Sequence, residues 1–502
     1  MTVGKSNPPP AASAGTPAAA AADPTAQGAV NTAPVSSAHP KWIFVTVIVA
    51  VFVSNLDLFV VNVAMPDIAR DYAGTSLSSL SWVLNAYAIV FAALLVVLGR
   101  LFDRNGLKRG FIIGLAVFTL GSVVCAIAPG LGWLIAARVV QAIGAAVLIP
   151  TSLALLVATT APHRRSGVVR AWSAMGGVAA ALGPVIGGLL TEIDWRWVFI
   201  INVPIGIVAL IASFRVLPEI RGDRSEPLPD ILGAALLTVA IGALALGLVQ
   251  ADEWGWLSGG VLGSFATTLV LMVLFVRRSR SHPSPVIELP LLKVPSFSLP
   301  TIATLLFTVA FLAMIFSAAL WAQNVWGYSA LKTGLAMAPG PLMVPILAIA
   351  AGPLVKRIGA GPVAALGNLF LGVGVLWWRL TAEAEPDYLG SFLPGLIIGG
   401  IGVGLALPTL IAAATTALPH QRLATASGVL NMARQIGAVL GVAMLVSILG
   451  TPGSPAAAVD AFHDGWVAIV LVCVLATVAA LTIRKDNTVS TPAEPPATAV
   501  AL

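Results

Sequence analysis

An acidic side chain lies inside the first long apolar stretch of this sequence, where Asp57 is the second residue of the segment 56–66. A carboxylate in hydrocarbon costs about 3 kcal/mol or more, so it faces a partner, a water-filled cavity or a solute. Asp57 comes about 15 residues into the stretch, roughly 20 Å deep at about 1.5 Å per residue. We expect it to exchange protons; the alternative is a purely structural hydrogen bond or ion pair.

Two further pairs of polar residues interrupt apolar stretches. Arg138 and Gln141 are one helical turn apart and would share a face, and Arg434 and Gln435 are adjacent. A buried Arg must be paired, whether it takes part in proton exchange or serves architecture alone. We expect Arg434 and Gln435 to face the inside of a helical bundle, and whether they touch a substrate stays open.

These residues must be positioned by membrane helices. The chain has 502 residues, of which 58% are hydrophobic and 10% charged, and its mean hydropathy is +0.96, which excludes an ordinary soluble protein. A spanning helix needs about 20 mostly apolar residues. Fourteen stretches qualify: 42–65, 80–99, 110–128, 131–157, 167–190, 197–215, 230–249, 257–276, 299–321, 333–354, 361–380, 388–414, 424–449 and 465–483.

The positive charges predict the orientation of the spans. Most of the 27 Lys and Arg residues fall in the tails and in the loops that follow even-numbered spans, including Arg104, Arg164, Arg221, Arg278 and Lys356. The loops after odd-numbered spans hold Arg70, Arg196, Lys332 and Arg379. Positively charged loops stay inside, so we expect a multi-pass protein of the cell membrane with both termini cytoplasmic.

Several classes of function are disfavoured. The net charge of +6 reports topology and not nucleic-acid binding. Cys125 and Cys473 fall within spans and no His does, so we expect no disulfide framework, no metal site and no cofactor. There is no Walker loop, and the glycines of 399–404 lie in a span, where they favour close helix packing. An ATP-driven pump or an enzyme with catalytic residues is therefore not expected.

An internal repeat organises the chain. Pro150 and Thr151, followed by an Ala-Thr-Thr-Ala-Pro sequence at 158–162, have counterparts in Pro408 and Thr409 with Ala-Thr-Thr-Ala at 414–417. The two copies are eight spans apart, whereas two six-span halves would give an offset of six. Two spans are therefore inserted, as expected for a secondary transporter with parallel halves and a solute site between them.

The fold class follows: an all-α polytopic membrane protein of two six-helix bundles in parallel pseudo-repeat, plus two inserted helices. Residues 1–40 are rich in Ala and Pro and read as a disordered cytoplasmic tail. The remaining parts are an N-terminal bundle at 41–215, cytoplasmic linkers at 216–297 with inserted spans near 230–249 and 257–276, a C-terminal bundle at 298–485, and a cytoplasmic tail at 486–502. We expect the inserted spans to be peripheral to the solute path.

Five segments now carry a resemblance to a known group. They are the acidic stretch at 56–66, the loop at 99–109, the span-4 sequence at 138–144, the span-5 sequence at 183–188 and the Trp-Arg-Trp segment at 195–204. Over residues 41 to 485 the chain resembles the fourteen-span drug:proton antiporter branch of the major facilitator superfamily. It departs from that branch at Ala179, where the full exporter motif has Gly, and it has no second acid inside span 10. The latter departure argues against dicationic substrates.

The resemblance implies roles for particular residues. Arg138 would face Asp57 in proton coupling, and the loop residues Gly99, Asp103, Arg104, Gly106, Lys108 and Arg109 would latch the inner gate in an outward-open state, the alternative being charges that set topology alone. The exporter motif residues Gly183, Pro184, Gly187 and Gly188 would flex or seal, since Pro removes a backbone hydrogen bond and Gly permits close approach; plain packing is the alternative.

The substrate cavity is expected to draw on polar and aromatic side chains. The candidates are Asn62, Gln141, Trp172, Trp321, Arg434 and Gln435. Trp82 and Trp326 could also stack on aromatic or cationic solutes, although Trp often serves as an interfacial anchor instead.

The sequence thus predicts a monomeric exporter of small amphipathic drugs, antibiotics or toxic metabolites that exchanges them for protons across the bilayer. A nutrient or metabolite symporter of the same fold is one alternative, and the direction of proton flux relative to substrate flux would discriminate it. A non-transporting membrane sensor or scaffold is another, disfavoured because no soluble signalling domain is present.

Overall fold

The computed structural model describes Met1, Thr2 and Gly4 and residues 40–72, 74–161, 164–221, 228–416 and 423–483. The predicted tails at 1–40 and 486–502 therefore lie almost entirely outside the described residues. The described part from Pro40 onward belongs to one compact unit, Ala38–Leu502.

Within the described ranges the secondary structure is entirely helical. The elements are α1 (Pro40–Asp71), α2 (Leu77–Asn105), α3 (Leu107–Ala126), α4 (Leu131–Thr159), α5 (Arg165–Thr191), α6 (Trp197–Ile200), α7 (Asn202–Val216), α8 (Ile231–Val249), α9 (Ala251–Trp254), α10 (Gly259–Ser281), α11 (Leu289–Leu292), α12 (Pro295–Leu320), the π-helical η2 (Trp321–Val325), α13 (Ala330–Met337), α14 (Pro339–Ile358), α15 (Ala360–Thr381), the π-helical η3 (Tyr388–Phe392), α16 (Leu393–Thr416), α17 (Leu423–Leu449) and α18 (Pro455–Leu481).

Thirteen helical segments in the described ranges are long and apolar enough to cross a membrane, and α5 carries a shorter apolar stretch at Met175–Thr191. Each of the fourteen predicted spans lies on a helix. Four of these spans contain two successive elements, namely α6 and α7, α12 and η2, α13 and α14, and η3 and α16. A helix satisfies its own backbone groups, which is why apolar stretches of this length form helices in a membrane.

The helix ends are fixed by local sequence. The Ser76 hydroxyl accepts a hydrogen bond from the backbone N–H of Ser79 and so caps the start of α2. Gly106 ends α2 with a φ of 128°, a left-handed value that favours glycine, and α3 begins at the next residue. The chain therefore turns sharply between α2 and α3.

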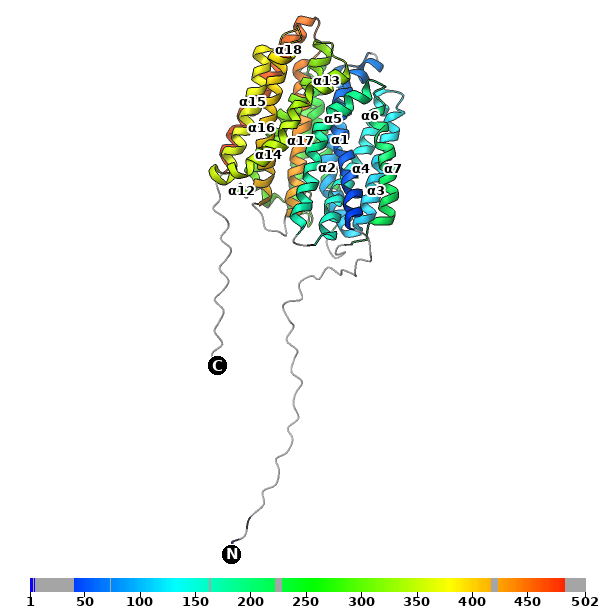
Figure 1. Ribbon diagram of the computed structural model, residues 1–502, viewed down its shortest axis with the longest axis vertical. Helices are drawn as coiled ribbons and strands as arrows, with labels where there is room; N and C mark the ends of the chain where they lie inside the picture. Colours follow the sequence, from blue (N-terminus) through cyan, green and yellow to red (C-terminus); the bar gives the residue numbers. More distant parts are fainter. Residues whose placement is uncertain are drawn as a thin grey trace. The chain divides into compact units, whose positions relative to one another are not determined.

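The helices gather in two groups. Helices α1–α5 and α7 pack mainly on one another, as do α12 and α14–α18. In Figure 1 the blue and cyan helices of the first group lie on one side and the yellow and orange helices α14–α18 on the other. Helices α8 and α10 pack together, and α8 also contacts α2 and α17 where the two groups meet.

The bundle has two ends, the terminal face and the opposite face. The terminal face holds the start of α1, the end of α18 and the connections at 105–107, 217–221, 228–230 and 358–360. The opposite face holds the connections at 74–76, 127–130, 192–196 and 326–329.

A cavity of about 1750 Å³ separates the two groups of helices. Its lining includes Arg100, Asp103, Arg165 and Glu288 at the terminal face, and it reaches Pro184 deeper in the bundle. No residue of α8 or α10 lines it. This central cavity is therefore accessible from the terminal face.

Candidate functional site

Asp57 of α1 and Arg138 of α4 form an ion pair inside the first group of helices. Arg138 Nη1 lies 2.5 Å from Asp57 Oδ2, and both side chains are 0% exposed. The predicted pairing of these two residues is thus present in the structure. Because a buried charge without a partner costs several kcal/mol, each residue requires the other in its charged form.

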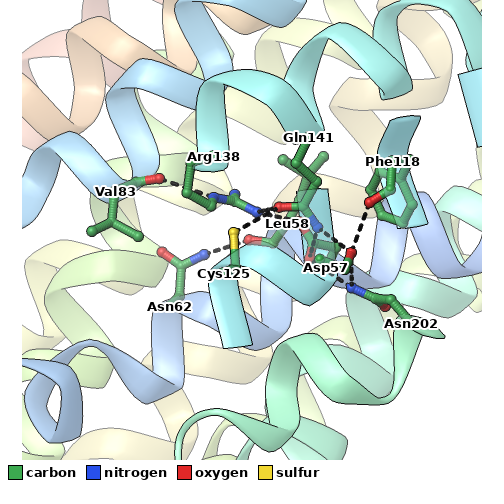
Figure 2. A network of polar contacts seen from close by, with 10 residues as sticks. Asp57, Leu58, Asn62, Val83, Phe118, Cys125, Arg138, Gln141 and Asn202 are labelled. Carbon is green, nitrogen blue, oxygen red and sulfur yellow. Dashed lines mark hydrogen bonds and ion pairs between the residues drawn. The ribbon is translucent and has the colours of Figure 1, made fainter. Parts of the chain in front are cut away.

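Neutral side chains complete the shell around the carboxylate. Gln141 Nε2 and Asn202 Nδ2 donate to Asp57 Oδ1 at 2.8 and 2.9 Å, and both amides also donate to the Ser122 hydroxyl. Arg138 Nη1 donates to Gln141 Oε1 at 2.6 Å. The two side chains thus share one face of α4, as their one-turn spacing predicted. Figure 2 shows Asp57 enclosed by Arg138, Gln141 and Asn202.

Arg138 is held on its other sides as well. Its Nε donates to the backbone oxygen of Val83 at 3.1 Å, and its guanidinium carbon lies 4.1 Å from the centre of the Tyr87 ring. Tyr87 in turn lines the central cavity. One aromatic ring therefore lies between the cavity and the ion pair, and protonation of Asp57 would remove the charge that Arg138 faces.

Asn202 and Ser122 belong to this network but are absent from the candidates that the sequence suggests. Asn202 begins α7, after the break that follows α6, and it is 1% exposed. A signal was available, since an Asn inside the predicted span 197–215 is as unusual as the other polar residues that were selected.

The other cavity candidates divide between two cavities. Trp172, Arg434 and Gln435 line the central cavity, and the Trp172 indole donates to the Ser152 hydroxyl at 3.0 Å. Asn62, Arg434 and Gln435 line a second cavity of about 80 Å³ that also contacts Arg138. Gln141 belongs to the ion-pair network and lines neither cavity.

Trp321 lies elsewhere. It is 0% exposed and packs against Trp466 with ring centres 4.8 Å apart, and Phe462 and Trp326 also contact it. Neither cavity is lined by Trp321, Trp326 or Trp82. The sequence placed Trp321 in the cavity because a large ring in a span can serve either packing or binding, and here it packs.

The loop motif between α2 and α3 packs against the end of α7 and the segment that follows it. Lys108 Nζ donates to the backbone oxygen of Phe214 at 2.9 Å, and Arg109 Nε lies 3.7 Å from Glu219 Oε2. A side chain at Gly106 would collide with the Glu219 carboxylate. Gly99 packs on Pro150, Asp103 is exposed at the cavity mouth, and Arg104 is partly buried.

Arg100, which the sequence-based candidates omitted, connects this motif to the linker before α12. Its guanidinium donates to the Ser284 hydroxyl, to the Pro285 backbone oxygen at 3.0 Å and to Glu288 Oε1 at 3.3 Å. Those residues line the mouth of the central cavity together with Arg100. The charge of Arg100 inside the loop at 99–109 could have indicated a functional contact. Its partner Glu288 could not be inferred, because it lies 188 residues away in sequence.

The span-5 motif closes the bundle toward the opposite face. A methyl group added at Gly188 would lie 2.6 Å from the Ala330 carbonyl oxygen and 2.8 Å from Leu331 Cα, both in α13. At Gly187 it would lie 2.9 Å from the Val60 oxygen in α1, and Gly183 packs on Phe59. The backbone oxygen of Pro184 packs against Gly334. The motif thus lets α5 contact α1 and α13 almost backbone to backbone.

Polar contacts at the opposite face join the first group of helices to α13 and η2, the two elements between α12 and α14. The Leu331 N–H donates to Glu192 Oε1 at 3.2 Å, and Gln323 Nε2 donates to the Val63 oxygen at 2.9 Å. The pKa of Glu192 is lowered because the Ser329 hydroxyl, and then the Leu331 N–H, donate to its carboxylate. The opposite face is therefore closed while the central cavity reaches the terminal face.

No cluster of three or more His, Cys, Asp or Glu side chains suited to a metal ion occurs in the ranges that the structure describes.

Comparisons with known proteins agree with this architecture. A family model described as Major Facilitator Superfamily matches residues 47–442, and it also matches residues 342–499. The multidrug resistance protein Stp of Mycobacterium tuberculosis is 34% identical over 400 residues, covering 79% of this chain and 74% of that protein. The cephamycin export protein CmcT of Amycolatopsis lactamdurans is 34% identical over 428 residues, covering 83% of this chain and 87% of that protein.

A solved structure shares the fold. The peptide transporter POT in complex with sulfate matches with a TM-score of 0.63 at 18% identity, over 89% of this chain and 95% of that chain. At this level of identity the likeness concerns the fold alone.

Proposed function

The chain belongs to the Major Facilitator Superfamily and is a transporter, and from this premise we propose that it exports small amphipathic molecules in exchange for protons. The names of the two relatives, a multidrug resistance protein and a cephamycin export protein, support export over uptake. We place the protein in the cell membrane as a monomer with both termini cytoplasmic.

Alternating access is the mechanism that the geometry supports. With the termini inside, the central cavity would receive its substrate from the cytoplasm, since Asp103 and Arg165 line its mouth at the terminal face. The contact of α5 with α13 would then be the outer seal. Export requires that seal to open while the mouth between Arg100 and Glu288 closes.

Proton coupling is carried by one observation, the complete burial of the Asp57 carboxylate beside Arg138. While Asp57 is charged, it accepts from Arg138, Gln141 and Asn202 and ties α1 to α4 and α7. A proton on Asp57 would weaken all three hydrogen bonds and free Arg138, so proton binding would loosen these helices. We infer that a proton arriving from outside favours release of the substrate, and that its loss to the inside resets the site.

Uphill export by Asp57→Asn tests this proposal. Asparagine keeps the volume of the side chain but cannot exchange a proton, so export driven by an imposed pH gradient in membrane vesicles should disappear, while binding and downhill exchange of a neutral substrate persist. Asp57→Glu should retain partial activity. Asp57→Asn leaves the buried Arg138 without its counter-ion, so some loss of stability is expected, and export is compared at equal amounts of protein in the membrane.

The matched control is Asp67→Asn on the same helix. Asp67 pairs with Arg70 near the opposite face and takes no part in the Asp57 network, so this variant should export at the parent's rate. Export by Asp57→Asn at the parent's rate, still abolished by an uncoupler, would place the coupling carboxylate elsewhere.

A further inference from the structure

The small cavity beside Arg138 is lined by an unusual set of polar atoms. Five residues that line it each carry a buried nitrogen or oxygen without a hydrogen-bond partner in the described part of the chain. These atoms are Asn62 Oδ1, Asn85 Oδ1, Arg138 Nη2, Arg434 Nε and Gln435 Nε2. Buried polar groups normally find partners, because leaving one unpaired costs about 1–3 kcal/mol. Their convergence on one cavity makes it suited to bind a polar group.

The charges around this cavity favour an anion. Arg138 is neutralised by Asp57, whereas no ion pair joins Arg434 to a carboxylate among the described residues. The contact given for the Arg434 guanidinium is to the Asn431 amide oxygen, at 3.3 Å. Arg434 is the twelfth residue of the 27-residue helix α17 and lies within its apolar segment Gly428–Leu449, which is long enough to span a membrane. A cation inside such a segment is costly, so an anionic group beside it would be stabilised.

Arg434 and Gln435 lie at the boundary between the two cavities. They line both, as do the apolar residues Leu58, Phe59, Phe311 and Leu407. The small cavity, about 80 Å³, is large enough for a carboxylate but not for the body of a drug. The central cavity, at about 1750 Å³, has room for a large apolar body.

We propose that Arg434 and Gln435 bind the carboxylate of an amphipathic acid, whose apolar body lies in the central cavity. The guanidinium supplies the charge, the Gln435 amide supplies a second donor, and the carboxylate enters the small cavity toward Arg138 Nη2. This assigns a substrate class, amphipathic acids, to the exporter, and so it rests on the proposed function. It also gives the substrate a route to the Asp57–Arg138 pair, because its carboxylate would compete with Asp57 for Arg138.

Binding to the purified full chain in detergent, without a pH gradient, tests the proposal. The probes are 1-pyrenebutyrate and its primary amide, which share the same apolar body and differ in charge. The parent should bind the acid at least tenfold more tightly than the amide at neutral pH. Arg434→Gln should abolish this preference, Arg434→Lys should retain part of it, and Gln435→Leu should weaken acid binding several-fold with little effect on the amide.

Arg165→Gln is the matched control. Arg165 is exposed and lines the mouth of the central cavity, so this variant removes the same charge from the cavity lining but far from the boundary. It should keep the preference for the acid. Gel filtration of each variant verifies folding, and Arg434→Lys preserves the buried charge should Arg434→Gln be unstable.

The carboxylate site would be overturned if the parent showed no preference for the acid over the amide, or bound neither probe. It would also be overturned if Arg434→Gln kept the full preference, or if Arg165→Gln lost the preference as completely as Arg434→Gln. A parent that shows no preference would leave water as the occupant of the small cavity. The result is independent of proton coupling, since no gradient is applied. A chain that fails uphill export but retains an Arg434-dependent acid preference would refute the proposed exchange and not this site.

Discussion

The ion pair of Asp57 with Arg138 illustrates how differently a buried pair responds to losing one partner and to losing both. Each charge has left water at a cost of several kcal/mol, and their attraction with the surrounding hydrogen bonds offsets that cost. Removing Arg138 alone would leave Asp57 with only the amide donors of Gln141 and Asn202. Removing both would leave a neutral site in which the amides of Gln141 and Asn202 still donate to the Ser122 hydroxyl.

A double-mutant cycle should separate these cases. Arg138→Met is expected to lower the free energy of unfolding by about 3 kcal/mol or more, whereas Asp57→Leu with Arg138→Met should recover most of that loss. Denaturation of the purified protein in detergent would measure the four free energies. If the double variant lost the sum of the two single losses, the pair would contribute no coupling energy and its burial would have another cause.

Sequence reasoning identified Asp57, Arg138 and Gln141 because charge and amide groups are conspicuous in apolar spans. The polar atoms without hydrogen-bond partners around the small cavity could not be identified from the sequence. Whether such an atom finds a partner depends on which side chains meet across helices. Asn85 was overlooked for this reason, although it is 0% exposed within α2. Trp321 was placed in the cavity because nothing in the sequence distinguishes a ring that packs from a ring that binds.

Among the elements, the pairing of α5 with α13 depends most directly on side-chain size. Gly188 faces the α13 backbone closely enough that any side chain must displace it. Since α5 belongs to the first group and α13 leads directly into α14 of the second, such a displacement would act on the closure of the opposite face. In this conformation the span-5 motif lets α5 and α13 close the opposite face. The expectation from the resemblance, that the motif flexes or seals during transport, stays a prediction.

Gly188→Ala should shift the conformational equilibrium toward opening at the opposite face. The added methyl would lie 2.6 Å from the Ala330 oxygen, closer than real contacts allow, so α13 must move away. Spin labels at Ile193 and Leu335, which are 68% and 54% exposed, would report the distance between the two groups. The native Cys125 and Cys473 are buried and should not be labelled.

Gly177→Ala provides the control on the same helix. A methyl group there would meet nothing within 4 Å, so the same chemical change should leave the distance distribution as in the parent. Equal behaviour of the two variants would show that the tight contact at Gly188 does not determine closure.

The positions of the helices followed from apolar length alone, whereas their interruptions did not. Length and composition do not reveal where a span breaks, and the breaks between α6 and α7 and between α13 and α14 fall inside stretches that look continuous. The first break matters for the site, because Asn202 begins α7 immediately after it and reaches Asp57.

For the molecule as a whole, the repeat and the inserted pair have a consistent spatial arrangement. The two groups of helices enclose the central cavity, and α8 lies against α2 and α17 outside its lining. The expectation that the inserted spans are peripheral to the solute path fits this placement, and the division of the chain at 41–215 and 298–485 stays a proposal.

The orientation in the membrane is the property on which the direction of transport depends. Lys and Arg residues concentrate at the terminal face, which predicts that this face is cytoplasmic. The cavity would then load from inside, as export requires. The opposite orientation would turn the same cavity toward the outside and favour uptake.

Single introduced cysteines would determine that orientation, because the native Cys125 and Cys473 are only 0% and 2% exposed. Leu257, 87% exposed in the connection before α10, belongs to the opposite face, and Leu228, 59% exposed before α8, belongs to the terminal face. A membrane-impermeant maleimide should label Leu257→Cys on intact cells and Leu228→Cys only after permeabilisation. A cytosolic reporter fused after Arg484, outside the described residues, should be active, and a periplasmic one should not. Labelling of Leu228→Cys on intact cells would invert the topology, and export through the cavity as it stands would then be untenable.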